Sequence, residues 1–488
     1  MQTSLLELEP HAVWKYFHQI TAVPRPSKKE GGILEYIKET VAKLGYAYEQ
    51  DKTGNILVRK PATPGFENAP TVLLQGHVDM VCEKNKGTEF DFDTDPIRAY
   101  VEGEWVTADG TTLGADNGIG VAMALAVLEA RDLVHPTLEF LFTVDEETGL
   151  TGAKGLKPGF VHADIMLNID SEEDGALYVG CSGGMDTAGV MVLEYEDAPA
   201  GYTALEIVVD GLKGGHSGLD IHAGRGNAIR FLARTLAALA KETDVRLAGI
   251  SGGSKRNAIP REAECTVRVP AESAPVVDKT VKDLNAIFLA EIGTVEPALK
   301  VSVKPSGEGG KTIIPAQFAT LLDVLRALPH GVLKMSADIP GLVETSTNLA
   351  TIAVDNGELT IGTSQRSSVE SEKQEAVDMV SAVFRLAGMR VVQGDGYPGW
   401  KPNMQSRALK VTKESFRELF GKDPEIKAIH AGLECGLIGE VYPGLDMISF
   451  GPTIEGAHSP DERVNIPAVD RCWQLVVRVL ENVAKGKA

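Results

Sequence analysis

Histidines and acidic residues stand in this chain where buried strands should end. The stretch "PTVLLQGHVDMVCE" places His77 and Asp79 directly after residues suited to a core strand. The strand-like segment "LEFLFTV" is followed in the same way by Glu146 and Glu147. A single strand that ends in polar residues would mean little, but the pattern recurs along the chain.

Three further residues extend the pattern. Asp170 follows the strand-like "DIMLNI", His458 follows a strand in "FGPTIEGAHSPDE", and Asp116 opens the apolar helix "DNGIGVAMAL". Because ligands gather at the carboxyl ends of strands in α/β sheets, these side chains are expected to share one rim. Histidine and carboxylate without cysteine suit zinc or a similar divalent ion. The carboxylates exceed what one tetrahedral zinc needs, whereas two ions about 3.5–4 Å apart with a bridging carboxylate would use them all.

Each of these residues also has a plainer interpretation. Asp116 at a helix start could simply be an N-cap. Glu146 and Glu147 could form a solvated acidic turn. Two adjacent glutamates can instead divide the work, one binding metal while the other takes a proton from water. The recurrence of the pattern favours the catalytic interpretation.

The elements that must position these residues alternate between strand and helix in the first third of the chain. "GGILEYIKETVAKLG" is typical of a helix that closes at Gly45. Strands linked by crossover helices predict an α/β layered domain. From residue 187 the pattern becomes α+β, and α/β features resume after the turn-rich "GDGYPGWKPN". The sequence thus predicts a catalytic domain over residues 1–186 and 401–488, with an inserted domain over residues 187–400.

Composition excludes several classes of protein. Lys+Arg total 48 against 68 Asp+Glu, a net charge of −20 without any basic block, so nucleic acid is not an expected partner. No run approaches the roughly 18 apolar residues of a membrane span, and the start lacks the features of a signal peptide. The five cysteines are scattered, which argues against a disulfide framework. A cytoplasmic protein that does not bind membranes is expected.

The ordered set of motifs "GHVD", "GADNG", "DEETG", "NIDSEEDG" and "GAHSPDE" resembles the co-catalytic zinc exopeptidases, a family that includes glutamate carboxypeptidase, peptidase T and aminoacylase. The insertion, with "GGHSG", "KRNAIP" and "HAGLECG", is most similar to that of the bacterial aminoacyl-histidine dipeptidases. The resemblance covers nearly the whole chain. It implies an α/β zinc-exopeptidase domain interrupted by an α+β lid and dimerisation domain. It also implies two divalent metal ions per subunit, zinc first, with cobalt or manganese as alternatives.

The resemblance also implies roles for the residues at the strand ends. Asp79 would orient His77 from behind, and Glu146 would be the general base. The bond between Asp116 and Asn117 would be cis. The metal ligands would be His77 and Asp170 for one ion, Glu147 and His458 for the other, and Asp116 as the bridge. Some relatives have glutamate where this chain has Asp170.

In the inserted domain, the resemblance implies that His216 reaches the active site of a partner subunit and stabilises the oxyanion. Asn257 and Arg366 would bind substrate, with Arg366 suited to a carboxylate. The "SQR" around Arg366 departs from the Asp-x-Arg of several relatives. His430 and Glu434 are spaced i, i+4, which is compatible with metal binding, but pocket lining or support is favoured since the ligand set is already complete.

The predicted function is a metal-dependent dipeptidase that hydrolyses unblocked dipeptides, among them aminoacyl-histidine types such as β-alanyl-histidine (carnosine). A homodimer formed through the inserted domain is expected. Alternatives on the same scaffold are an N-acyl amino acid deacylase and an aminotripeptidase. A metal-binding protein that has lost catalysis would be expected to lack the base or a ligand, and this chain retains them all.

Overall fold

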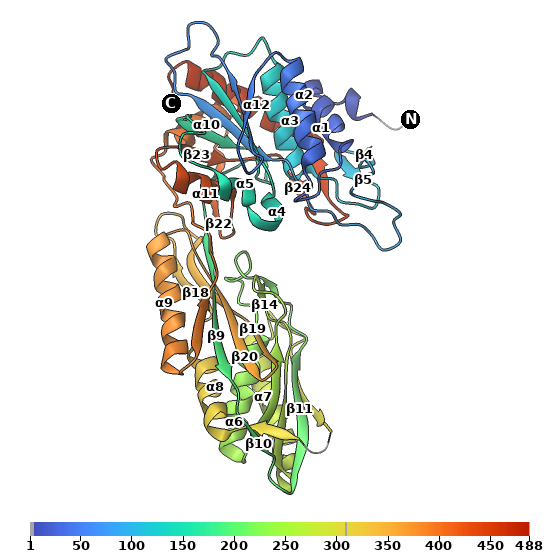
Figure 1. Ribbon diagram of the computed structural model, residues 1–488, viewed down its shortest axis with the longest axis vertical. Helices are drawn as coiled ribbons and strands as arrows, with labels where there is room; N and C mark the ends of the chain where they lie inside the picture. Colours follow the sequence, from blue (N-terminus) through green and yellow to red (C-terminus); the bar gives the residue numbers. More distant parts are fainter. Residues whose placement is uncertain (1–3, 308–309, 488) are drawn as a thin grey trace. The chain divides into compact units, whose positions relative to one another are not determined.

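The computed structural model describes residues 4–307 and 310–487, and the chain divides into two compact units (Figure 1). The first unit consists of the chain up to Gly180, Pro402–Ala428, and the chain from Leu433 onward. The second unit consists of Cys181–Lys401 together with the short return Ile429–Gly432. The second unit therefore interrupts the first twice.

The first unit is built on a mixed sheet whose central strands are parallel. β3 pairs in parallel with both β6 and β7, and β23 pairs in parallel with β7. Every residue of β3, β6 and β7 is buried, as expected for strands covered on both faces. From edge to edge, the strand order is β1 (Tyr48–Gln50), β2 (Ile56–Lys60), β6 (Leu138–Thr143), β3 (Val72–His77), β7 (Ile165–Asn168), β23 (Asp446–Ser449), β8 (Ala176–Cys181) and β22 (Glu425–Ile429).

Helix α3 (Ala115–Glu129) is the central helix of this unit. It is apolar and buried on nearly every side, which is typical of a core helix. It packs against β3 and against α1 (His11–Thr21) and α12 (Ile466–Ala484) (Figure 1). The remaining helices are the 3-10 turn η1 (Leu5–Glu7), α2 (Gly31–Lys43), α4 (Glu146–Gly149), α5 (Thr151–Gly155), α10 (Arg407–Phe420) and α11 (Glu434–Val441). The predicted helix end at Gly45 is confirmed, since α2 stops two residues earlier and Gly45 has a φ of 85°.

A small antiparallel sheet accompanies the large one in the first unit. Its strand order is β24 (Ile454–Glu455), β25 (Arg463–Asn465), β5 (Trp105–Ala108) and β4 (Ala99–Glu102). The connection between β24 and β25 carries His458. Because β25 pairs with β5, this connection is tied to the segment that leads into α3.

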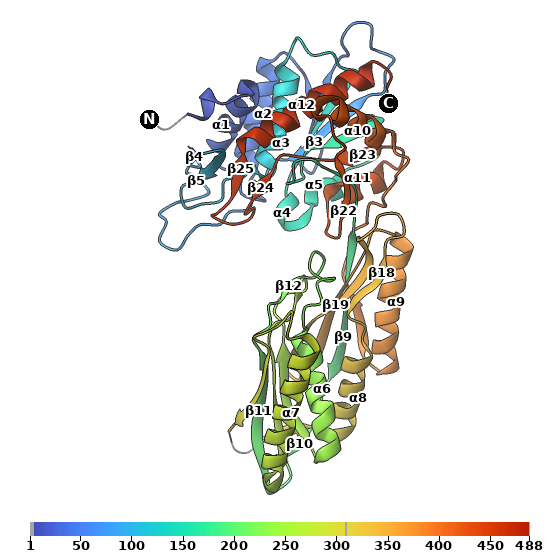
Figure 2. The same cartoon turned by 180° about the vertical axis from the view of Figure 1, so that it is seen from behind.

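The second unit has an antiparallel sheet with helices packed on one face (Figure 2). Alternate residues of β11 are buried, and Ile207 and Val209 face their buried partners Cys265 and Ala263 in β15. This period of two directs one face of β11 toward the helices and leaves most of the other face partly exposed. The strand order is β16 (Lys300–Pro305), β11 (Tyr202–Asp210), β15 (Ala263–Pro270), β13 (Arg246–Gly252), β19 (Val343–Asp355), β20 (Glu358–Ser367), β9 (Gly183–Val192) and β21 (Arg390–Gln393), with β18 (Gly331–Met335) also paired to β19.

The helices of the second unit are α6 (Ala228–Glu242), η2 (Ala271–Ser273), α7 (Ala274–Ile292), α8 (Pro315–Ala327) and α9 (Glu370–Leu386). Phe231 of α6 and Phe288 of α7 pack ring against ring, with centroids 4.8 Å apart, in the core between helices and sheet. Two strand pairs complete the unit: β10 (Tyr195–Asp197) with β17 (Lys311–Ile313), and β12 (Gly215–His216) with β14 (Ala258–Ile259). The predicted fold class, an α/β domain with an inserted α+β part, is confirmed. No helix within the described residues is long and apolar enough to cross a membrane.

Candidate active site

His77 stands at the end of the central strand β3 and faces two carboxylates. Its side chain is only 1% exposed, and its Nε2 lies 3.2 Å from Oδ1 of Asp116 and 3.3 Å from Oδ1 of Asp170. Asp170 follows β7, the parallel neighbour of β3, so the two strands deliver their terminal side chains to the same edge. The three residues form a group whose ligand atoms could hold a metal ion.

A second group shares Asp116. Nε2 of His458 lies 3.2 Å from Oδ2 of Asp116 and 3.1 Å from Oε2 of Glu147. Asp116 therefore turns one oxygen toward each histidine, which is the arrangement that a carboxylate bridging two ions requires. The sequence motifs are up to several hundred residues apart, and the structure brings all five predicted metal ligands together.

The backbone at the start of α3 positions the shared carboxylate. Asp116 has non-helical dihedral angles, and the bond between Asp116 and Asn117 is cis, as the family resemblance implied. The side-chain amide of Asn117 donates to the carbonyl of Ile169, next to Asp170. A Cβ at Gly76 would lie 2.3 Å from Oδ1 of Asn117, so a larger residue there would displace the Asn117 amide.

Asp79 links His77 to the turn that carries the glutamates. Its fully buried carboxylate accepts hydrogen bonds from the backbone N–H groups of Glu146, at 3.0 Å, and Glu147, at 3.2 Å. It also lies 3.4 Å from Nδ1 of His77 and accepts a hydrogen bond from Oγ of Ser27. Burial alone would raise the pKa of Asp79, but His77 and these donors outweigh it and hold that pKa at about 2. An ionised Asp79 can therefore orient both His77 and Glu146.

The site is electrostatically suited to cations. Burial raises the pKa of Glu146 well above its usual value, although the nearby His77 opposes the shift. Burial likewise raises the pKa of Asp170 to about 6. Hydrogen bonds to Asp116 and Glu147 raise the pKa of His458 to about 11. Burial and the neighbouring carboxylates together produce these shifts, and a bound cation would offset the excess of negative charge.

The donor atoms fit divalent metal ions. Oε1 of Glu147 is a buried acceptor without a hydrogen-bond partner in the described chain, and Oδ1 of Asp170 has only its ion-pair contact with His77 there. Imidazole and carboxylate ligands without cysteine match the preferences of zinc and of similar divalent ions. Glu146 stands beside His77 and Glu147 in a further candidate group.

Three other predicted residues lie in the second unit and converge there. His216 belongs to β12, which pairs with β14 at Ala258, and the carbonyl of Asn257 accepts a hydrogen bond from the N–H of Ser217 at 2.8 Å. Arg366 donates to Oγ of Ser217 at 3.3 Å. Ser217 thus contacts Asn257 and Arg366 by hydrogen bonds and directly follows His216 in the chain.

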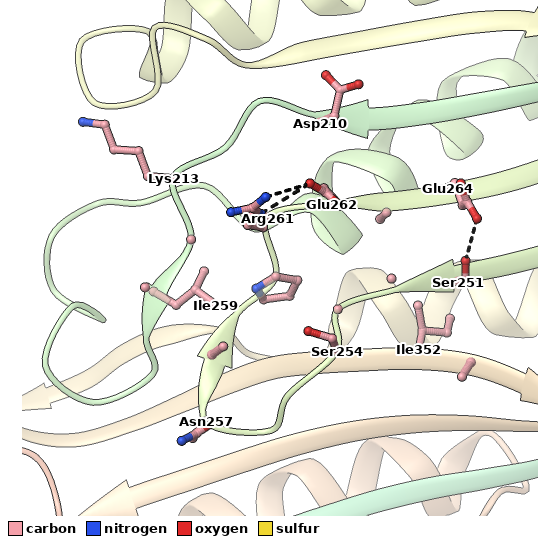
Figure 3. A pocket seen from close by; sticks show the side chains of 18 of the residues that line it. Asp210, Lys213, Ser251, Ser254, Asn257, Ile259, Arg261, Glu262, Glu264 and Ile352 are labelled. Carbon is pink, nitrogen blue, oxygen red and sulfur yellow. Dashed lines mark hydrogen bonds and ion pairs between the residues drawn. The ribbon is translucent and has the colours of Figure 1, made fainter. Parts of the chain in front are cut away.

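A hollow of about 890 Å³ opens beside two of these residues (Figure 3). His216 and Asn257 line it, together with Lys213 and Arg261 from neighbouring loops. Its floor is formed by residues such as Glu264, which lie on the sheet face opposite the helices. None of the five predicted metal ligands lines this hollow, so it is a feature of the second unit alone.

His430 and Glu434 do not form a helical pair. His430 lies in the second unit, where its Nε2 is 2.7 Å from Oγ of Ser346. Glu434 begins α11 in the first unit and accepts hydrogen bonds from Gln75 at 2.6 Å and Thr143 at 2.7 Å. Their i, i+4 spacing therefore does not reflect a shared metal site, in agreement with the supporting roles favoured from sequence.

Sequence reasoning missed three residues near these sites, of which two, Arg25 and Glu462, are buried. Tyr397, in the turn-rich "GDGYPGW", accepts a hydrogen bond from Arg366 at 2.9 Å. Arg25 and Glu462 contact the segment that leads to Asp116. Only Glu462 had a signal in the sequence, because it ends the motif "GAHSPDE" that also contains His458.

The fold and the site define a known class. The chain belongs to the peptidase family M20/M25/M40, whose model matches residues 73–482. This membership confirms the resemblance that was inferred from the ordered motifs.

Within that family, the chain is 43% identical to the cytosol non-specific dipeptidase of Escherichia coli over 99% of both chains. The crystal structure of the aminoacylhistidine dipeptidase of Vibrio alginolyticus superposes with a TM-score of 0.91, at 42% identity, over 98% of both chains. A tripeptidase from Staphylococcus aureus shares the fold, with a TM-score of 0.58 and 18% identity, over 98% of this chain and 99% of that one.

Metal stoichiometry tests the proposed bridging role of Asp116. We expect Asp116→Ala to lower metal occupancy at both positions, because this carboxylate faces both histidines. His458→Ala should empty mainly one position, since His458 belongs to the second group. Elemental analysis of the purified variants measures the ions bound per chain, and loss of a single ion in both variants would contradict the bridge.

Proposed function

We propose that this protein is a dinuclear metal-dependent dipeptidase that hydrolyses unblocked dipeptides. The observation that carries the proposal is Asp116, whose two oxygens face His77 and His458 separately, with Glu146 beside the same group. Asp170 and Glu147 would complete the two sites. Zinc is the proposed metal, with cobalt and manganese as alternatives.

Two bound divalent ions would supply Lewis-acid activation of a water molecule and of the peptide carbonyl. Glu146 would accept a proton from that water as the water oxygen attacks the carbonyl carbon. When the C–N bond breaks, Glu146 would return the proton to the leaving nitrogen, which departs as an amine.

His216 is proposed to stabilise the oxyanion. Its Nδ1 accepts hydrogen bonds from the backbone N–H groups of Gly218, at 3.2 Å, and Leu219, at 3.1 Å. Burial, reinforced by the charge of Arg366, lowers the pKa of His216 to about 4, so the ring is neutral at neutral pH. A neutral ring that accepts at Nδ1 must carry its proton on Nε2, and Nε2 is then the hydrogen-bond donor.

Arg366 is proposed to bind the terminal carboxylate of the substrate. Its side chain is 7% exposed and is held by Ser217 and Tyr397, and no carboxylate forms an ion pair with it in residues 4–307 and 310–487. A buried guanidinium without an acidic partner is costly unless an anion binds there. Asn257 is proposed to contact the same substrate, because its backbone joins the Ser217 segment.

Aminoacyl-histidine dipeptides such as β-alanyl-histidine are proposed to be among the substrates. Support comes from the names of the two relatives of 43% and 42% identity, a cytosol non-specific dipeptidase and an aminoacylhistidine dipeptidase. The first name also supports a cytoplasmic location. An N-acyl amino acid deacylase or an aminotripeptidase would use the same chemistry. The deacylase would accept substrates without a free amine, and the aminotripeptidase would accept a longer peptide.

We also propose that two chains form a homodimer through the second unit. Strand β18 pairs only with β19 among the described residues, and its Val332, Leu333 and Met335 are exposed. An apolar strand edge of this kind can pair with its symmetry mate. In such a dimer, His216 is proposed to complete the active site of the partner.

Replacement of the base tests the mechanism. We expect Glu146→Gln to retain both metal ions, because Glu146 is not one of the five proposed ligands. Hydrolysis should fall by about a hundredfold to ten-thousandfold, since the amide keeps the shape but cannot accept a proton. Steady-state kinetics and metal analysis of the same preparation measure both effects, and near-normal turnover would remove Glu146 from the mechanism.

A substrate panel tests the reaction class. After reconstitution with zinc, we expect hydrolysis of free dipeptides, including β-alanyl-histidine, and little hydrolysis of the same dipeptides carrying N-acetyl groups. Chromatographic detection of the released amino acids measures each rate. Preferential cleavage of N-acetyl amino acids would instead favour the deacylase, and preferential cleavage of tripeptides the aminotripeptidase.

Subunit mixing tests the role of His216 in the partner's site. We expect His216→Ala to lose activity by about a hundredfold or more while it keeps both ions. Mixing it with Glu146→Gln should restore activity, because one site in the mixed dimer then has both an intact base and an intact His216. Each variant incubated alone is the control. If labelled subunits demonstrably exchange and activity does not return, His216 does not act across the interface.

A further inference from the structure

The side chain of Glu462 holds the segment that leads to Asp116. Its carboxylate is 2% exposed and accepts four backbone N–H groups. Oε2 accepts from Leu113 at 2.8 Å and Gly114 at 2.9 Å, and Oε1 accepts from Ala115 at 2.7 Å and Asp116 at 3.3 Å. These donors lie at the N-terminal end of α3, where N–H groups lack helical partners and favour a negative charge.

A buried arginine holds the same segment from the other side. Arg25 is fully buried, and its Nη2 donates to the carbonyl of Gly114 while its Nη1 donates to the carbonyls of Val78 and Asp79. Gly114 has a φ of 71°, and a Cβ there would lie 2.4 Å from Nη2 of Arg25. Arg25 thus attaches the Asp116 segment to the end of β3, the strand of His77.

Glu462 attaches the Asp116 segment to a different part of the chain, the connection between β24 and β25 that carries His458. The backbone N–H of Glu462 donates to Ser459 at 3.1 Å, and its carbonyl accepts from Oγ1 of Thr107 at 2.8 Å. The two charged side chains therefore have separate tasks: Arg25 connects Asp116 to His77, and Glu462 connects Asp116 to His458.

The two histidines differ in how firmly their own surroundings hold them. His77 belongs to a buried strand and is 1% exposed, whereas the side chain of His458 is 53% exposed. His458 also has a φ of 63°, in the left-handed region that non-glycine residues seldom adopt. His458 consequently depends on its loop contacts, and Glu462 supplies the buried, charged contact of that loop.

We infer that Glu462 is a positioning residue for one of the two metal positions, the one formed by Asp116, Glu147 and His458. Its carboxylate sets the distance between the His458 loop and Asp116. The other position, formed by His77, Asp116 and Asp170, retains the Arg25 and Asn117 contacts without it. This inference rests on the proposed dinuclear site.

The test is metal binding by Glu462→Gln. The amide keeps the size of the side chain but has one acceptor oxygen for four N–H groups, and its own NH₂ opposes the others. We expect the metal-free wild-type protein to bind two Co²⁺ ions, and the variant to bind one with unchanged affinity and the other about 10-fold to 100-fold more weakly. Calorimetry gives the affinities, and the visible absorption of Co²⁺ reports the ligand geometry.

Glu455→Gln is the matched control. Glu455 lies on β24, seven residues before Glu462, but it is exposed and forms an ion pair with Arg463. We expect this variant to bind both ions as the wild type does. If the wild type itself binds no pair of ions, the proposed dinuclear function fails; if it binds two and Glu462→Gln matches it, only the present inference fails.

A double-mutant comparison separates positioning from general destabilisation. Glu462→Gln combined with His458→Ala should lose no more metal than His458→Ala alone, since both changes act on the same position. Glu462→Gln combined with Asp170→Asn should weaken metal binding at both positions. Equal weakening of both ions in Glu462→Gln alone would overturn the inference. Should Glu462→Gln fail to fold, Glu462→Asp, which keeps the charge on a shorter side chain, must show the same selective loss for the inference to stand.

Discussion

The crowding of carboxylates around two histidines is the constraint on which the rest of the structure depends. The Nε2 atoms of the two histidines lie 3.1 to 3.3 Å from carboxylate oxygens of Asp116, Glu147 and Asp170. The side chains of these three acidic residues are largely shielded from solvent. Buried charges of one sign are expensive unless cations or protons compensate for them. The raised pKa values of His458 and Asp170 report this demand, and two divalent ions would meet it.

The scaffold keeps these groups together by using backbone groups and a few buried charges. Parallel strands end at one edge of the sheet, so β3 and β7 deliver His77 and Asp170 side by side. The start of α3 supplies Asp116 from the adjoining layer, and Gly76 leaves room for the side-chain amide of Asn117. Two buried side chains of opposite charge then hold the Asp116 segment in place. Arg25 attaches it to the end of β3, and Glu462 attaches it to the connection that carries His458.

The second unit also places charged and polar side chains in buried surroundings, but on a different scaffold. Its antiparallel sheet buries one face against helices and leaves the other face and the strand ends for polar side chains. Arg366 and His216 are largely buried near one another, and the charge of Arg366 helps to keep His216 neutral. Among the described residues, no carboxylate forms an ion pair with the Arg366 guanidinium, which instead contacts Ser217 and Tyr397.

The sequence by itself determined the residue types at the strand ends, the α/β and α+β patterns, and the family, because periodicity and strand-end motifs are local properties of a chain. The tertiary structure alone decided which oxygen of Asp116 faces which histidine. It also separated His430 from Glu434 despite their helical spacing, and revealed Arg25, Tyr397 and Glu462. These features consist of contacts between segments that are distant in sequence. Such contacts depend on how the layers pack, and no local pattern of residues specifies that packing.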